Sequence, residues 1–275
     1  MKKLLVFLLL CCPFAVANAQ LTAVGVAGSD GYSVFRGSYN MGVPFVPGLS
    51  VVPQAAMYSR DGMDTMYKYG LGLNWQTPFL DILEIGADGS YTPKENGYSN
   101  YALGGYASLD IAHLMMGFLP MDSFKIGGGA RKTFHTFYGS PDIDINETDI
   151  YAFIRAAKGG LDLGATYTKA IDYSASTSGV APAWLDIPGL NAVYGGFLDY
   201  SLSVDAGYTY KIVRPFASYS LIKVKEAKET DDLRLGLTVK LAVVNVHGAV
   251  EWYNFSKKEG QDRQRFYTLN ASVGF

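Results

Sequence analysis

Cysteine is almost absent from this chain. The two cysteines, Cys11 and Cys12, both lie in residues 1–19, which have the pattern of a secretory signal peptide: a charged start, a short apolar run and a small-residue cleavage site. We expect cleavage before Gln20. The mature chain would then contain no cysteine, which excludes disulfides and thiol chemistry although the signal implies export to an oxidising compartment.

Long apolar runs and basic clusters are missing as well. The apolar run of the signal is far shorter than the roughly 20 residues of a membrane-spanning helix, and no later segment reaches that length without a polar interruption. The net charge is −2, loss of Lys2 and Lys3 with the signal takes it to −4, and no basic run is longer than a pair. We therefore expect neither a transmembrane helix nor a nucleic-acid partner.

The last ten residues carry the clearest pattern in the rest of the chain. Alternating positions are aromatic or apolar, and the residues between them are polar or glycine. A period of two places successive side chains on opposite faces of a strand. The segment therefore predicts a strand with one apolar face, formed by Tyr267, Leu269, Ala271, Val273 and Phe275.

This ending resembles the C-terminal strand of bacterial outer-membrane β-barrel proteins. In that class a terminal aromatic residue, here Phe275, and apolar residues at alternating positions before it form the signal that the barrel-assembly machinery recognises. The resemblance implies a location in the bacterial outer membrane, contact with its lipid and lipopolysaccharide, and the assembly machinery as a partner. No motif of a particular subfamily accompanies it.

Further segments repeat the alternation, and several place aliphatic residues in the middle and Tyr or Trp near an end. That order is typical of strands that cross a bilayer, because Tyr and Trp favour the headgroup level and aliphatic side chains the hydrocarbon. The strands are expected at 49–59, 67–76, 79–91, 98–112, 123–135, 148–157, 160–170, 199–211, 214–225, 233–241, 244–252 and 266–275.

The pattern predicts an all-β fold, a single antiparallel up-and-down transmembrane β-barrel over residues 20–275, with about 12 strands. Residues 20–48 hold a possible extra hairpin around 28–31, which gives the alternative of 14. A soluble β-sandwich is the competing interpretation, and it would leave the aromatic ends of the strands unexplained.

The connections alternate in length, which sets the orientation. Short turns are expected at 77–78, 158–160, 213–214 and 242–243, and longer polar segments at 92–97, 136–147, 171–197, 225–231 and 256–263. In outer-membrane barrels short turns face the periplasm and long loops the outside. The longest segment, 171–197, is similar in position and length to the loop that narrows the lumen of general porins. A loop that packs over the rim is the simpler alternative.

The polar phase of the strands supplies charged groups and histidines that would face the lumen. They form either salt bridges that fill the interior or a charge-lined path through it. The candidates are Lys68, Glu84, Asp88, Asp110, Lys125, Arg131, His135, Arg155, Asp162, Asp199, Asp205, Arg234, Lys240, His247 and Glu251.

No segment predicts a catalytic, metal or cofactor site. The acidic residues between 142 and 149 lack the glycine and the final bidentate acid of a calcium loop. Among the histidines only His135 is a plausible base, as in the outer-membrane hydrolases, and no motif accompanies it. The leading expectation is a porin-like passive channel for small solutes. The alternatives are a closed structural or adhesion barrel that acts through its outer loops, and a hydrolase that uses His135.

Overall fold

The computed structural model describes residues 19–78, 82–115, 118–173, 196–225, 227–258 and 262–274. Within these ranges the chain forms fourteen strands and one short helix, and no helix there is long and apolar enough to cross a membrane. The elements are β1 (Gln20–Gly28), β2 (Ser33–Gly42), β3 (Leu49–Ser59), β4 (Met66–Gln76), β5 (Leu83–Glu95), β6 (Tyr98–Asp110), α2 (Ile111–Leu114), β7 (Ser123–Phe137), β8 (Ile143–Lys158), β9 (Leu161–Tyr173), β10 (Leu198–Tyr208), β11 (Val213–Val224), β12 (Thr230–Leu241), β13 (Val244–Tyr253) and β14 (Gln264–Gly274).

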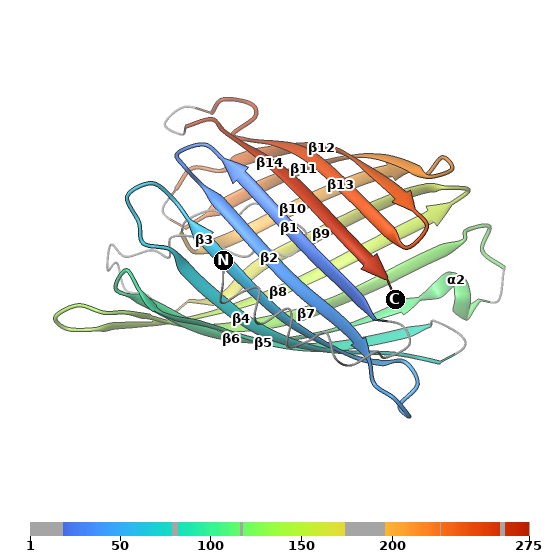
Figure 1. Ribbon diagram of the computed structural model, residues 1–275, viewed down its shortest axis with the longest axis horizontal. Helices are drawn as coiled ribbons and strands as arrows, with labels where there is room; N and C mark the ends of the chain where they lie inside the picture. The colour runs from blue at the N-terminus through green and yellow to red at the C-terminus, as the bar shows by residue number, and fades with distance from the viewer. Residues whose placement is uncertain are drawn as a thin grey trace.

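All strands belong to one closed antiparallel barrel, in which each strand pairs with its neighbours in the sequence (Figure 1). The first and last strands close it, with Gln20 opposite Gly274 and Gly28 opposite Phe266. Strands β3 to β14 are the twelve expected from residue 49 onward, and the hairpin β1–β2 adds two. The 14-strand alternative is therefore confirmed, and the β-sandwich interpretation is wrong.

The two faces of the sheet differ in polarity. Ser203 and Ser220 are buried on the inner face, and their hydroxyl oxygens lie 2.8 Å apart. Because side chains alternate between faces, the apolar residues beside such positions point outward. The outer face carries a band of exposed apolar side chains, which includes Leu71, Ile85, Leu103, Ile154, Leu163, Leu202, Leu237 and Leu269. This band is what a barrel surface in contact with lipid requires.

The barrel has a terminal end, where Gln20 and Gly274 lie, and a distal end opposite to it. At the terminal end the turn expected at 213–214 is wrong in position: β11 begins at Val213, whose N–H donates to the Tyr210 carbonyl over 3.0 Å. The connection 111–122 at this end is longer than the expected short turns and carries α2.

At the distal end β7 and β8 extend beyond their expected bounds. The expected loop 136–147 shrinks to 138–142, because β7 runs to Phe137 and β8 begins at Ile143. The added residues have a physical reason to stay in the sheet. Phe137 and Ile145 are both buried in an apolar cluster inside the barrel.

Candidate functional site: the barrel interior

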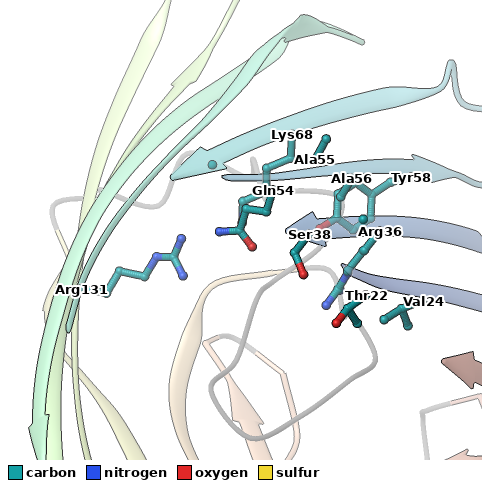
Figure 2. Close-up of a pocket in the computed structure, with 12 residues that line it drawn as sticks. Thr22, Val24, Arg36, Ser38, Gln54, Ala55, Ala56, Tyr58, Lys68 and Arg131 are labelled. Carbon is teal, nitrogen blue, oxygen red and sulfur yellow. The ribbon is translucent and has the colours of Figure 1, made fainter. Parts of the chain in front are cut away.

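A cavity of about 250 Å³ lies inside the barrel between β1–β4 and β7. Three cationic side chains from three strands line it: Arg36 of β2, Lys68 of β4 and Arg131 of β7. Figure 2 shows Arg131 extending from β7 toward the opposite wall, where Gln54 and Ser38 lie. The cavity is therefore a polar space with cationic groups on two sides.

Small residues make this space. Gly37, Ala55, Ala56 and Gly70 all line the wall that β2, β3 and β4 form. A Cβ at Gly70 would lie 2.6 Å from Nε2 of Gln54, so the glycine allows the Gln54 amide to lie along the wall. Larger side chains at Ala56 and Gly70, which lie opposite the inward-facing Arg36 and Gln54, would occupy the room that a solute needs.

The Arg131 guanidinium is held in place by β5, which lies two strands from β7 in the sheet, beyond β6. Its Nη2 donates to the Ser90 hydroxyl over 3.0 Å and lies 3.6 Å from Oδ2 of Asp88. Arg131 also lines a second, smaller cavity of about 40 Å³, where His135 and Glu147 lie. Arg131 thus stands between the larger cavity and a buried polar network.

That network is centred on His135, which is only 4% exposed. Its Nδ1 lies 2.7 Å from the Tyr98 hydroxyl, which also accepts a hydrogen bond from the Asn100 amide over 2.7 Å. On the other side of the ring, Nε2 lies 3.4 Å from Oε2 of Glu147. Oε1 of Glu147 accepts a hydrogen bond from the Leu198 N–H over 3.1 Å. His135, predicted near the outer end of its strand, is thus a buried interior residue.

Two apolar clusters fill much of the interior at the distal end, and neither was predicted from the sequence. The alternation along β11 could have predicted them, because Ile222 and Val224 lie on the same face of the strand as the buried Ser220. One cluster contains Val26, Tyr32, Val34, Ala56, Tyr58, Leu198, Ile222, Val224 and Phe266. The other contains Met66, Tyr98, Phe137, Ile145 and Phe197.

Several of the predicted lumen residues form pairs nearer the terminal end. Glu84 accepts a hydrogen bond from the Tyr106 hydroxyl over 2.6 Å and lies 3.8 Å from Nζ of Lys125. Both carboxylate oxygens of Asp162 accept hydrogen bonds from Arg214, one of them from Nε over 2.9 Å. Arg214 was not among the predicted lumen residues because a turn was expected at its position.

On β12 and β13, Arg234 and His247 are neighbours. Nη2 of Arg234 lies 2.8 Å from Nε2 of His247, and the Thr238 hydroxyl lies 3.0 Å from Nδ1 of the same ring. The Glu251 side chain is buried on β13.

Three further predicted lumen residues, on β8, β10 and β12, differ in their surroundings. Arg155 and Lys240, near the terminal end of their strands, are exposed. Asp205 approaches Gly164 on the inner face, where a Cβ on the glycine would lie 2.4 Å from its carboxylate.

Two predicted lumen residues, Asp110 and Asp199, do not lie along the lumen wall as expected. Asp110 lies at the foot of β6, where it caps α2 through the N–H groups of Ala112 and His113 and accepts a hydrogen bond from the Ser123 hydroxyl over 2.6 Å. Asp199 lies 2.6 Å from Nζ of Lys169.

Lys169 lies on the face of β9 that exposes Tyr167 and Ile171, so the Asp199 carboxylate is on the outside of the barrel. The cause is a register shift between Leu198 and Tyr200, which breaks the alternation at this residue.

The acidic residues between 142 and 149, most of which fall in the connection expected at 136–147, are mostly in a strand. Asp144, Asn146 and Asp149 belong to β8, and Asp144 accepts a hydrogen bond from the Thr136 hydroxyl over 2.8 Å. Among the described residues, no group of three or more His, Cys, Asp or Glu side chains could hold a metal ion.

Three expectations fall wholly or largely outside the described residues. They concern the signal at 1–19, of which 1–18 are not described, the loop at 171–197, of which 174–195 are not described, and the terminal Phe275. Phe197, the last residue of the expected loop, and Leu198 are described. Both are buried, at 3% and 1% exposure.

No protein-family model and no curated protein matches the sequence. Among solved structures, the outer-membrane protein Omp33 of Acinetobacter baumannii is 12% identical, with 94% of this chain and 98% of that chain covered and a TM-score of 0.52. CdiB from Acinetobacter baumannii is 11% identical, covers 93% of this chain and 60% of that chain, and has a TM-score of 0.51. The KdgM porin is 11% identical over 93% of this chain and 99% of that chain, with a TM-score of 0.46. The chain therefore has the fold of bacterial outer-membrane β-barrel proteins.

Proposed function

We propose that the protein is a porin-like passive channel for small polar solutes in the bacterial outer membrane. The observation that carries the proposal is the contrast between the two faces of the closed barrel. The outer face presents a band of apolar side chains, whereas the inner face encloses a cavity lined by Arg36, Lys68 and Arg131. Buried charges inside a membrane protein are costly, and they commonly mark the path of a polar solute.

Export and assembly follow the same proposal. Residues 1–19 are a cleaved signal peptide, and residues 20–275 form one barrel domain. The start of β1 at Gln20, the first expected mature residue, supports this division. The alternating apolar face of β14, with Tyr267 and Leu269 exposed, supports recognition by the barrel-assembly machinery. Lipid and lipopolysaccharide would cover the outer band.

A closed structural or adhesion barrel is the second candidate function. The observation that favours it is the filling of the distal end by the two apolar clusters, into which Phe197 and Leu198 pack. In that case the described interior charges would serve stability, and function would reside at the distal surface.

A hydrolytic function is not proposed. His135 is buried beneath the distal end, and both ring nitrogens face protein groups, the Tyr98 hydroxyl and the Glu147 carboxylate. A general base must reach the proton that it abstracts, and the cavity that His135 lines is only about 40 Å³, too small for a lipid or peptide substrate.

Single-channel recording from refolded residues 20–275 in a planar bilayer with symmetrical KCl tests the proposal. Folding is first checked by heat-modifiable migration on a gel. Discrete, stable openings of folded protein are expected for a channel. Persistent silence of folded protein would refute the channel and favour the closed barrel.

A further inference from the structure

We infer that the 250 Å³ interior cavity is a binding site for a small organic anion, whose carboxylate or phosphate group is held by Arg131, Lys68 and Arg36. This inference rests on the proposed function, because it names the class of solute that the barrel would favour. It is carried by the charge of the lining, by the shape of the cavity, and by a contrast with the other interior charges.

The charge at the cavity is of one sign. Three cationic residues line it, and no acidic residue does so among the parts of the chain that the structure describes. Guanidinium groups match the planar geometry of carboxylates and phosphates and form charge-assisted hydrogen bonds with them. The carboxylate of Asp88, on β5 two strands away, lies 3.6 Å from Nη2 of Arg131, which is an ion-pair distance but longer than a direct hydrogen bond.

The three cations converge from separate strands. Arg36, Lys68 and Arg131 lie on β2, β4 and β7, and the last of these faces the other two across the cavity (Figure 2). A group between the walls can therefore be contacted from both sides. Because this site lies inside a barrel, its field is screened less than that of surface charges.

The remaining lining suits an organic molecule with hydroxyl groups. Gln54 and Ser38 offer amide and hydroxyl partners on the same wall. Toward the distal end the wall is aromatic, because Tyr58 lines the cavity and Arg36 lies 5.7 Å from the centre of its ring. A volume of 250 Å³ equals the share of on the order of eight water molecules. That space suits a single sugar ring with an acidic group rather than a long chain.

The interior charges nearer the terminal end are arranged differently. There Arg214 makes two hydrogen bonds to Asp162, and Lys125 lies 3.8 Å from Glu84. Each of those cations pairs with a carboxylate two strands away on the inner face, and neither borders the 250 Å³ cavity. Arg131 makes a similar pair with Asp88, at 3.6 Å. Unlike Arg214 and Lys125, however, it borders one common open space with Lys68 and Arg36, which is the geometry that an anion from solution requires.

Isothermal titration calorimetry of the refolded barrel in detergent tests the inference without any need for conduction. The probes are glucuronate and glucose 6-phosphate, with glucose as the neutral control. We expect at least one of the two anions to bind, and we expect no measurable binding of glucose. Binding of glucuronate alone would identify a carboxylate site, and binding of glucose 6-phosphate alone a phosphate site.

The variant Arg131→Gln should weaken anion binding about tenfold, since one charge-assisted contact is lost. Lys132→Gln is the matched control, because Lys132 is exposed on the opposite face of the same strand and the change in net charge is identical. Arg36→Gln provides a second test if Arg131→Gln does not fold. Equal binding by wild type, Arg131→Gln and Arg36→Gln would overturn the inference.

The experiments distinguish a failure of the anion-site inference from a failure of the proposed channel function. A folded barrel that conducts KCl and binds neither anion refutes the anion site and leaves the channel intact. A folded barrel that binds glucuronate and never conducts supports the site and refutes the channel. In a conducting barrel, a KCl gradient should give a reversal potential of anion-selective sign, which moves toward cation selectivity in Arg131→Gln and stays unchanged in Lys132→Gln.

Discussion

The carboxylate of Glu147 accepts a hydrogen bond from the backbone N–H of Leu198 over 3.1 Å, although the two residues are 51 positions apart. Both residues are 1% exposed. The other carboxylate oxygen lies 3.4 Å from Nε2 of His135. One side chain of β8 thus fixes the start of β10 inside the barrel, next to Phe197.

Removal of this carboxylate should destabilise the barrel. In Glu147→Leu the buried Leu198 N–H and the His135 ring lose their partner, and an unsatisfied buried polar group costs about 1–3 kcal/mol. Glu147→Gln keeps a carbonyl that can accept from Leu198 and should cost less. Equilibrium urea unfolding in lipid vesicles gives the free energies. Equal stability of the Leu variant and wild type would show that the hydrogen bond contributes nothing.

Phe197 is expected to restrict the lumen. Its ring is 3% exposed and lies 5.2 Å from the ring of His135 and 6.3 Å from that of Phe137, between centroids. Phe197→Ala removes a buried aromatic ring from the distal cluster and leaves space there. We therefore expect a larger single-channel conductance than in wild type.

The matched control is Phe118→Ala, because Phe118 is exposed (86%) in the connection at the terminal end. That variant should keep the wild-type conductance. An unchanged conductance in folded Phe197→Ala would place the conduction path away from this ring.

The strands could be predicted because their signal is local. The sequence predicts a strand at 49–59, and β3 is Leu49–Ser59. Alternation of polar and apolar residues needs no knowledge of the partner strand, and a bilayer enforces it along every strand. The hairpin β1–β2 was only an alternative, so Arg36, which lines the cavity, was not among the expected lumen residues.

The arrangement of the interior could not be predicted, because it depends on which strands meet. The contact between Glu147 and Leu198 joins β8 to the start of β10, which follows a long connection, and no periodic pattern in the sequence predicts it. The prediction that Asp199 faces the lumen was wrong for another reason. A fixed period of two assigns it to the lumen, and the register shift beside Tyr200 turns it outward.

Gly48 should be intolerant of a side chain. It lies in the connection between β2 and β3 with φ of +81°, and a Cβ there would lie 1.9 Å from the backbone oxygen of Gln76. Gly48→Ala therefore combines a strained left-handed conformation with a backbone clash. We expect a loss of more than about 1 kcal/mol in the free energy of unfolding.

Gly62→Ala separates the two causes. Gly62 has φ of +78°, and a Cβ there would meet nothing within 4 Å. It should show the conformational cost alone, on the order of 1 kcal/mol. If both variants lose the same stability in urea unfolding, the Gln76 contact at Gly48 has no effect of its own.

Glu229, in the distal connection between β11 and β12, should make the stability of that region depend on pH. Hydrogen bonds from the Tyr200 hydroxyl and from Nζ of Lys258, the latter over 3.0 Å, lower the pKa of this carboxyl below its ordinary value of 4.5. A lowered folded pKa means that the carboxylate stabilises the protein above pH 4.5 and that this contribution is lost as the pH falls through the folded pKa.

Glu229→Gln should therefore unfold at a lower urea concentration than wild type at pH 7, and the difference should shrink at lower pH. Lys258→Gln should reduce the pH effect, whereas Lys257→Gln, with the same change of charge at the next residue, should retain it. A difference between wild type and Glu229→Gln that is constant across this pH range would contradict the assignment.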